Sequence, residues 1–205
     1  MLIERVQQEN GLDVKEEGGN LILTANYKLG NLDKAQWTIH PDGMATLDYT
    51  YNFSGVVDLM GICFDYPQVL SKRWLGAGPY RVWQNRIHGT QYDIWENDYN
   101  DPIPGETFTY PEFKGYFGSV SWMSIHTKEG TISLTNETPD SYIGVYQPRD
   151  GRDRLLYTLP ESGISVLNVI PPVRNKVNST DLCGPSSQPK WVDGPQTGRL
   201  VLRFE

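Results

Sequence analysis

The sequence has few residues suited to metal binding or nucleophilic chemistry, with two cysteines and three histidines among its 205 residues. Cys63 and Cys183 lie far apart and show neither a CxxC motif nor the Cys/His spacing of a zinc site. A cysteine thiol in an apolar strand behaves as a small hydrophobe. We therefore interpret both cysteines as core residues, with a disulfide as the alternative.

Long hydrophobic runs and runs of basic residues are also missing. No stretch approaches the roughly 20 consecutive apolar residues that a membrane-spanning helix requires, and residues 1–5 lack the basic and apolar regions of a signal peptide. The 18 basic residues are scattered among 25 acidic ones, for a net charge of −7, which argues against nucleic acid as a partner. We expect a soluble protein without membrane or nucleic-acid partners. The compartment, bacterial periplasm or cytoplasm, stays open, since a domain taken from a longer protein would lack that protein's targeting signal.

Glycine, proline and aromatic residues are plentiful. The chain has 20 glycines, 14 prolines and 12% aromatic residues, a composition that suits many short strands joined by turns. Its length is sufficient for one all-β domain with a substantial core. We predict a single β-sandwich domain spanning residues 1–205.

The clearest strand is residues 45–53, where apolar and polar residues alternate with the period of a strand that has one face on a core. Pro41-Asp42-Gly43 supplies a turn before it, because Asp-Gly accepts the positive φ that a hairpin requires. We predict a hairpin over residues 35–53. No window shows sustained helical periodicity, so at most a short helical turn is expected. Further strands are predicted at residues 21–27, 115–126, 131–135, 141–146, 163–170 and 199–204.

Residues 74–89 read Trp-Leu-Gly-Ala-Gly-Pro-Tyr-Arg-Val-Trp-Gln-Asn-Arg-Ile-His-Gly. This segment resembles the Trp-Tyr-Gly-x-Gly-Pro-x-Glu-Asn-Tyr-x-Asp-Arg stretch in the C-terminal β-sandwich domain of glycoside hydrolase family 2 β-galactosidases. Trp83 stands where the family has tyrosine. The residues that coincide are Trp74, Gly76, Gly78, Pro79 and Arg86.

Three positions of the segment depart from the family pattern. Arg81, Val82 and Asn85 replace the usual Glu, Asn and Asp. The substitution at Arg81 reverses a charge, so a sugar or ion contact made by the family's acid is not carried over. These departures favour a structural loop over a ligand-binding signature.

The flanking residues fall in the order of the family, and the resemblance covers roughly residues 59–134. Residues 61–67 resemble the strand before the motif, although Met60 replaces an arginine, and residues 110–115 and 120–122 resemble two stretches after it. Leu167-Asn168-Val169 resembles a Leu-Asn-Ile strand near the family's end. That alignment places Val166 at the position where the family has an aromatic side chain that borders the sugar pocket. Either the alignment is out of register here, or this protein recognises a different sugar.

The resemblance implies an all-β, galactose mutarotase-like supersandwich of antiparallel sheets. Family 2 glycosidases take both catalytic carboxylates from a separate (β/α)8 barrel, and this chain has neither the length nor the strand-helix alternation for one. The resemblance therefore implies that the chain is a non-catalytic domain excised from the C-terminal region of a larger β-galactosidase-like glycosidase. Its implied partners are the barrel of the same polypeptide and a galactoside-like carbohydrate.

The candidate carbohydrate-binding residues are Tyr80, Trp83, Arg86, His88 and Glu112. Trp74 is interpreted as core, whereas Tyr80 and Trp83 are divided evenly between core packing and stacking on a sugar face. For Arg86 we favour a structural role, through a charged hydrogen bond to Glu112 or to backbone carbonyls.

Two alternatives to the accessory domain remain. One is an autonomous carbohydrate-binding module with Tyr80 and Trp83 as an exposed platform. The other is an aldose-epimerase-like enzyme, which needs a histidine and a carboxylate in one pocket. His88 is the best placed histidine for that role, with His40 and His126 as the others.

The sequence predicts no cofactor, no catalytic residue and no metal site. An acidic stretch has the oxygen ligands for calcium but lacks the spacing of an EF-hand loop, and we interpret it as a solvated turn. Its residues are Asp98, Asn100, Asp101 and Glu106.

Overall fold

A computed structural model describes residues 11–28, 30–66, 68–98, 115–145, 163–172 and 184–205. Within these ranges the regular elements are β-strands and one 3-10 turn, η4 (Pro185–Ser187). The predicted all-β class is therefore confirmed.

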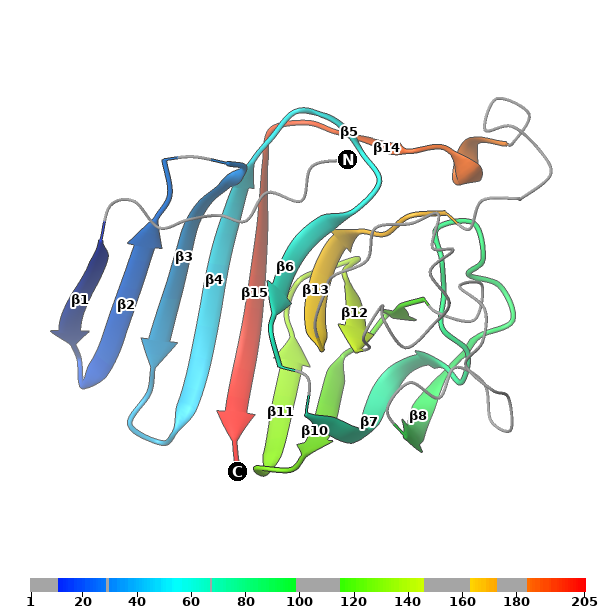
Figure 1. Cartoon of the computed structure of the whole chain (residues 1–205). Coiled ribbons are helices and arrows are strands. Elements are labelled where there is room, and N and C mark those ends of the chain that lie inside the picture. The colour runs from blue at the N-terminus through cyan, green and yellow to red at the C-terminus, as the bar shows by residue number, and fades with distance from the viewer. Residues whose placement is uncertain (1–10, 29, 67, 99–114, 146–162, 173–183) are drawn as a thin grey trace.

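The larger sheet contains nine strands, all paired antiparallel, and its centre is formed by strands from both ends of the chain (Figure 1). Residues 195–204 form a strand between the strands of residues 44–52 and 131–136, so the sheet is complete only when these segments are paired. In spatial order the strands are β1 (Leu12–Glu17), β2 (Asn20–Asn26), β3 (Leu32–Ile39), β4 (Met44–Asn52), β15 (Pro195–Phe204), β11 (Thr131–Asn136), β10 (Trp122–Thr127), β7 (Val69–Gly78) and β8 (Gln91–Asp98).

A smaller antiparallel sheet of four strands packs against one face of the large sheet. Its order is β6 (Met60–Phe64), β13 (Ile164–Val169), β12 (Tyr142–Val145) and β9 (Phe117–Gly118). A separate ribbon pairs β5 (Gly55–Val57) with β14 (Lys190–Val192). The two facing sheets give the molecule a sandwich-like architecture.

The register of the large sheet aligns its apolar residues in rows across the strands. Leu202 of β15 is paired with Ala45 on one side and Leu134 on the other, and Met123 is paired with both Leu134 and Trp74. All five are buried. Side chains alternate between the faces of a strand, so this row faces one layer only. The small sheet supplies the opposing side chains Phe117, Ile143, Val145, Ile164 and Val166.

The hairpin predicted over residues 35–53 is confirmed by β3 and β4. The amide of His40 donates to the Met44 carbonyl at 2.8 Å, and Gly43 has the positive φ of 85° that the turn requires. The strands predicted at residues 21–27, 131–135, 141–146, 163–170 and 199–204 are also present, with small differences at their ends.

The single strand predicted over residues 115–126 is wrong, because the chain changes sheets within it. β9 pairs with β12 in the small sheet, whereas β10 pairs with β7 and β11 in the large one. Ser119 lies between them with a φ of 50°, in the left-handed region that breaks an extended chain. Sequence analysis also missed strands at residues 12–17, 55–57, 69–78, 91–98 and 190–192.

The predicted core position of Cys63 is wrong. Cys63 lies on β6, an edge strand of the small sheet, and its side chain is exposed. Its neighbours Ile62 and Phe64 pack against the core. Because side chains alternate along a strand, Cys63 faces away from that core. Cys183 lies outside the described residues.

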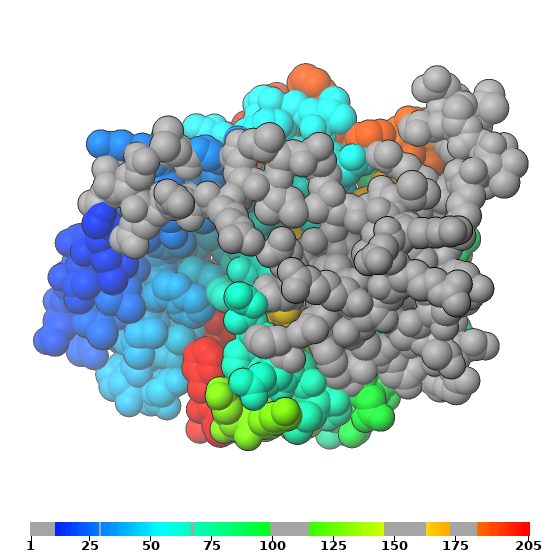
Figure 2. Space-filling view, viewed as in Figure 1, coloured from blue at the N-terminus to red at the C-terminus, as the bar shows by residue number. Residues whose placement is uncertain are grey.

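The large sheet extends beyond the small one at its β1 edge. Figure 2 shows β1 and β2 at one lateral edge of the molecule. Every residue of β1 is exposed, including Leu12 and Val14. The core therefore lies under β4, β15, β11, β10 and β7, where the two sheets overlap.

Replacing Trp74 with alanine is expected to destabilise the protein strongly. The side chain is fully buried between the sheets, and removal of a buried aromatic typically costs about 3–5 kcal/mol. Urea denaturation measures this change in the free energy of unfolding. Trp191→Ala is the matched control, because Trp191 is 66% exposed and its loss should cost less than about 1 kcal/mol. Equal losses in the two variants would contradict the assigned core.

The stability of the fold is expected to decrease at alkaline pH. Burial raises the pKa of Tyr49 to about 12, and burial also raises the pKa of Tyr51. Because the folded pKa lies above the unfolded value of about 10, this stability is fully present below pH ~10 and is lost as the pH rises toward the folded pKa. Urea denaturation at about pH 9 and about pH 11 measures the loss. The loss should be smaller in Tyr49→Phe, and an identical pH dependence in that variant would contradict this role.

Candidate functional site

The first part of the segment at residues 74–89 is strand, not turn. Trp74 to Gly78 form the end of β7 and pair with β8. The Trp74 ring is fully buried, with its centroid 4.6 Å from that of Phe117, and its indole N–H donates to the Ala77 carbonyl at 3.1 Å. The predicted packing role of Trp74 is confirmed.

The two glycines in this strand allow neighbouring chains to approach closely. A Cβ on Gly76 would lie 3.0 Å from the Cα of Val120, and a Cβ on Gly78 would lie 2.5 Å from the Trp95 ring. Neither distance leaves room for a side chain without displacement. The glycine pattern therefore reflects packing of β7 against its neighbours, and the structural loop expected for the segment begins only after Gly78.

A loop of residues 79–90 follows, after a cis peptide bond between Gly78 and Pro79, and leads into β8. Within it the Trp83 and Arg86 backbones exchange hydrogen bonds of 3.1 and 2.9 Å, which close a four-residue turn. Val82 is bridged to Tyr116, at the start of the chain that forms β9. Backbone contacts therefore fix the loop on both sides.

Trp83 is a core residue. Its side chain is 1% exposed, and its ring lies edge-to-face with Tyr116 at 5.6 Å between centroids. Val82, Leu167 and Ile170 complete the cluster. Burial leaves its ring no solvent-facing surface, so Trp83 does not form the exposed sugar platform weighed for it from the sequence.

Side-chain amides tie the loop to the C-terminal part of the chain. Gln84 Nε2 donates to the carbonyls of Ser186 and Gln188 at 3.0 and 2.8 Å. Asn85 Nδ2 donates to Ser187 Oγ at 2.8 Å. These bonds attach the loop to η4, about 100 residues later in the sequence.

The remaining candidates lie at the exposed tip of the loop. Tyr80 is 45% exposed, and Arg86 and His88 are exposed as well. The Arg86 backbone closes the turn and its side chain is exposed, so the charged hydrogen bond expected of its guanidinium stays a prediction. Glu112, the partner proposed for it, lies outside the described residues.

Arg81, the charge reversal within the segment, points into the protein. It is 8% exposed, and its guanidinium carbon lies 5.5 Å from the centroid of the Phe117 ring. The ammonium of Lys72, also buried, lies 5.5 Å from the same centroid. Such cation–π contacts stabilise buried cations. Arg81 thus acts in the interior and not at the loop surface.

The three histidines lie on separate elements. His88 is in the loop. His40 lies beside the hairpin turn, with its Nε2 3.0 Å from Thr46 Oγ1. His126 lies on β10, with its Nδ1 3.2 Å from Oγ1 of Thr131 on β11. Of the acidic stretch, Asp98 ends β8, and Asn100, Asp101 and Glu106 lie outside the described residues. Val166 is fully buried in the core and presents no side chain to a pocket.

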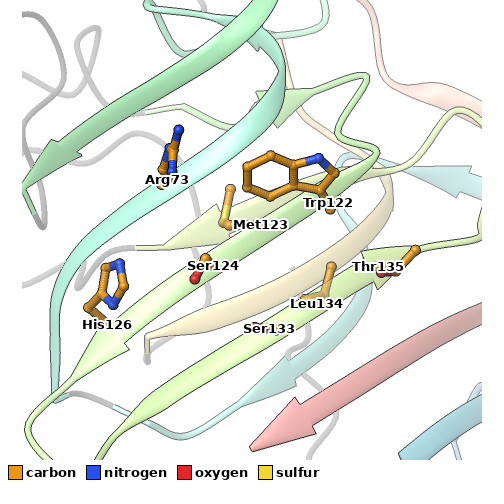
Figure 3. Close-up of a pocket in the computed structure, with 8 residues that line it drawn as sticks. All are labelled: Arg73, Trp122, Met123, Ser124, His126, Ser133, Leu134 and Thr135. Carbon is orange, nitrogen blue, oxygen red and sulfur yellow. The ribbon is translucent and has the colours of Figure 1, made fainter. Parts of the chain in front are cut away.

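Sequence analysis missed a groove of about 400 Å³ over β7, β10 and β11 (Figure 3). The alternation of Trp122, Ser124 and His126 with the buried Met123 and Ile125 was the signal that could have revealed it. Its lining consists of Arg73, Trp122, Met123, Ser124, His126, Ser133, Leu134 and Thr135.

No protein-family model matches this sequence, and no curated protein matches it. The part of the chain that the structure describes contains no helix long and apolar enough to cross a membrane. The resemblance to family 2 β-galactosidases therefore stays a prediction from the residues of the segment and its flanks.

Gln84→Ala is expected to loosen the contact between the loop and η4. The variant loses two hydrogen bonds to backbone carbonyls, with an expected cost of about 1–2 kcal/mol. Hydrogen exchange should become faster at the amides of Ser187 and Gln188, which close η4. Gln91→Ala, which truncates an exposed glutamine, is the control. Unchanged exchange in η4 would contradict the role given to Gln84.

Proposed function

We propose that the chain is a non-catalytic β-sandwich domain of a β-galactosidase-like glycoside hydrolase. In this proposal it packs against the catalytic barrel of the same polypeptide and helps to shape the carbohydrate pocket. The observation that carries the proposal is that the segment at residues 74–89 has two parts. Residues 74–78 form a joint that packs between the sheets, and the exposed residues of the loop, Tyr80 and residues 86–88, form the tip. Trp74, Gly76 and Gly78, which match the family, lie in the joint, whereas Arg86, which also matches, lies in the tip that is available to a neighbouring domain.

The joint supports the resemblance in physical terms. Trp74 packs on Phe117 of the opposite sheet, while Gly76 and Gly78 allow the strands to approach. Each of these residue types is required by a contact, so their shared spacing is what a common two-sheet fold would impose.

The tip has the composition of an interaction surface. Tyr80 and Ile87 are 45% and 48% exposed, beside the polar side chains of Arg86 and His88. Exposed apolar side chains grouped with an arginine are common at protein interfaces. In the proposed enzyme the barrel supplies both carboxylates, about 5 Å apart in a retaining glycosidase, and the tip borders the sugar.

In the full-length polypeptide, the double substitution Tyr80→Ala and His88→Ala is expected to raise KM for nitrophenyl galactoside by roughly tenfold, with a smaller change in kcat. The reason is that the tip contributes to substrate binding without taking part in the chemistry. Leu12→Ala is the control, since it truncates an exposed side chain on the distant β1 edge (Figure 1). Steady-state kinetics of the three proteins provide the comparison.

Two results would contradict the proposal. The first is a full-length polypeptide that has no catalytic barrel, and the second is a double variant with unchanged KM. Accelerated exchange of galactose anomers by the present chain, lost in His88→Ala, would favour the aldose-epimerase alternative. Sugar binding by the chain alone that is lost in Tyr80→Ala would favour a carbohydrate-binding module with the tip as its platform.

A further inference from the structure

The groove over β7, β10 and β11 opens on the face of the large sheet that is opposite to the small sheet. Met123 and Ile125 point into the core, so Trp122, Ser124 and His126 project from the other face of β10. Figure 3 shows Trp122 and His126 toward opposite ends of this strand, with Arg73 on the neighbouring strand. The groove is therefore distinct from the loop at residues 79–90.

Register divides this outer face into an apolar row and a polar row. Trp122 is paired with Leu75, which is paired with Ile94, and Ile94 is 48% exposed. The polar row runs parallel to the apolar row, two residues away from it along each strand, and ends at Arg203 of β15. From β8 to β15 its members are Glu96, Arg73, Ser124, Ser133 and Arg203.

Polar groups on this face are available to a ligand: Arg73 lines the groove, and Glu96 lies beside Arg73 on the neighbouring strand β8, outside the lining of the groove. Within the described residues, no hydrogen bond or ion pair is found for the Arg73 guanidinium, the Glu96 carboxylate or the Trp122 indole N–H. Arg73 and Glu96 are cross-strand neighbours, so a strong donor and a strong acceptor lie side by side on one edge of the apolar row. Polar groups converging on an aromatic surface are typical of small-molecule sites.

We propose that this groove binds an uncharged hexopyranose unit of an oligosaccharide. A pyranose presents an apolar C–H face and a rim of hydroxyls, which matches the indole of Trp122 beside the polar row. Arg73 donates to sugar hydroxyls, and Glu96 and the serine hydroxyls accept from them. Because Glu96 balances the charge of Arg73, the site favours a neutral sugar over a uronic acid. The proposal does not depend on the parent enzyme suggested above.

The spacing of the strands suits an extended ligand. Neighbouring strands lie roughly 4.8 Å apart. Both rows cross the direction of the strands, the apolar row from β8 to β10 and the polar row from β8 to β15. An oligosaccharide lying along the rows would keep one face of its rings on the apolar row and its hydroxyls on the polar row. The groove itself, about 400 Å³ in volume, accommodates the unit on Trp122.

The test is calorimetric titration of the chain with a β-linked galactotetraose, with cellotetraose and tetragalacturonate as comparison ligands. We expect binding of at least one neutral tetrasaccharide, weakened by at least about tenfold in Trp122→Ala and in Arg73→Ala. Trp122→Phe should retain part of the affinity, because it preserves a ring for stacking. Trp191→Ala, on the β5–β14 ribbon, should leave the affinity unchanged.

Thermal unfolding of each variant provides the control for folding. Since Trp122 and Arg73 project outward, all variants should unfold within a few degrees of the original protein. Failure of both neutral tetrasaccharides to bind, or equal affinity in Trp122→Ala, would overturn the proposal. Tighter binding of tetragalacturonate would overturn its neutral specificity. Burial of this face against another domain of the full-length polypeptide would also overturn it. None of these results depends on the KM measurement that tests the parent enzyme.

Discussion

The contact between Trp74 and Phe117 joins the two sheets, and the other features of the structure depend on it. Trp74 lies on β7 in the large sheet, and Phe117 lies on β9 in the small one, with 4.6 Å between their centroids. Gly76 allows β7 to pass close to the backbone at Val120, where the chain turns from β9 to β10. Two buried cations border the same Phe117 ring. One aromatic pair thus sets the spacing at which both the core and the loop at residues 79–90 are assembled.

Assembly of the large sheet depends on contacts between distant parts of the sequence. β15 pairs with β4 from Pro195↔Asn52 to Arg203↔Met44, and with β11 on its other side. Gly198 lies directly against the ring of Tyr49, where a side chain would collide with it. Long-range pairing of this kind must bring distant parts of the chain together before the core is complete. The burial that raises the pKa of Tyr49 therefore depends on the pairing of β15 with β4.

Local chemistry accounts for the parts of the fold that the sequence predicted. Asp42-Gly43 specifies a turn and residues 45–53 alternate, so the β3–β4 hairpin follows from neighbouring residues alone. β8 was missed because apolar and polar residues occur on both of its faces, and β1 because all its residues are exposed and none is needed for the core. Burial of Trp83 was not predictable, since it depends on Tyr116 and Leu167 from other elements. The residues of the exposed tip were predicted as candidates, but the groove was not predictable because it joins the β10–β11 hairpin to β7, which is distant in sequence.

The same register that builds the core also builds the groove. Met123 and Ile125 must face the small sheet, and this requirement fixes the direction of every other side chain on β10. A shift of one residue would bury His126 and Ser124 and expose the core residues, at a large cost in free energy. Trp122 is therefore held on the outer face by residues that take no part in the groove. The face of the large sheet that packs on the small sheet supplies the core, and the side chains on the outer face contribute little to it. The outer face is therefore free to acquire a binding function without loss of stability.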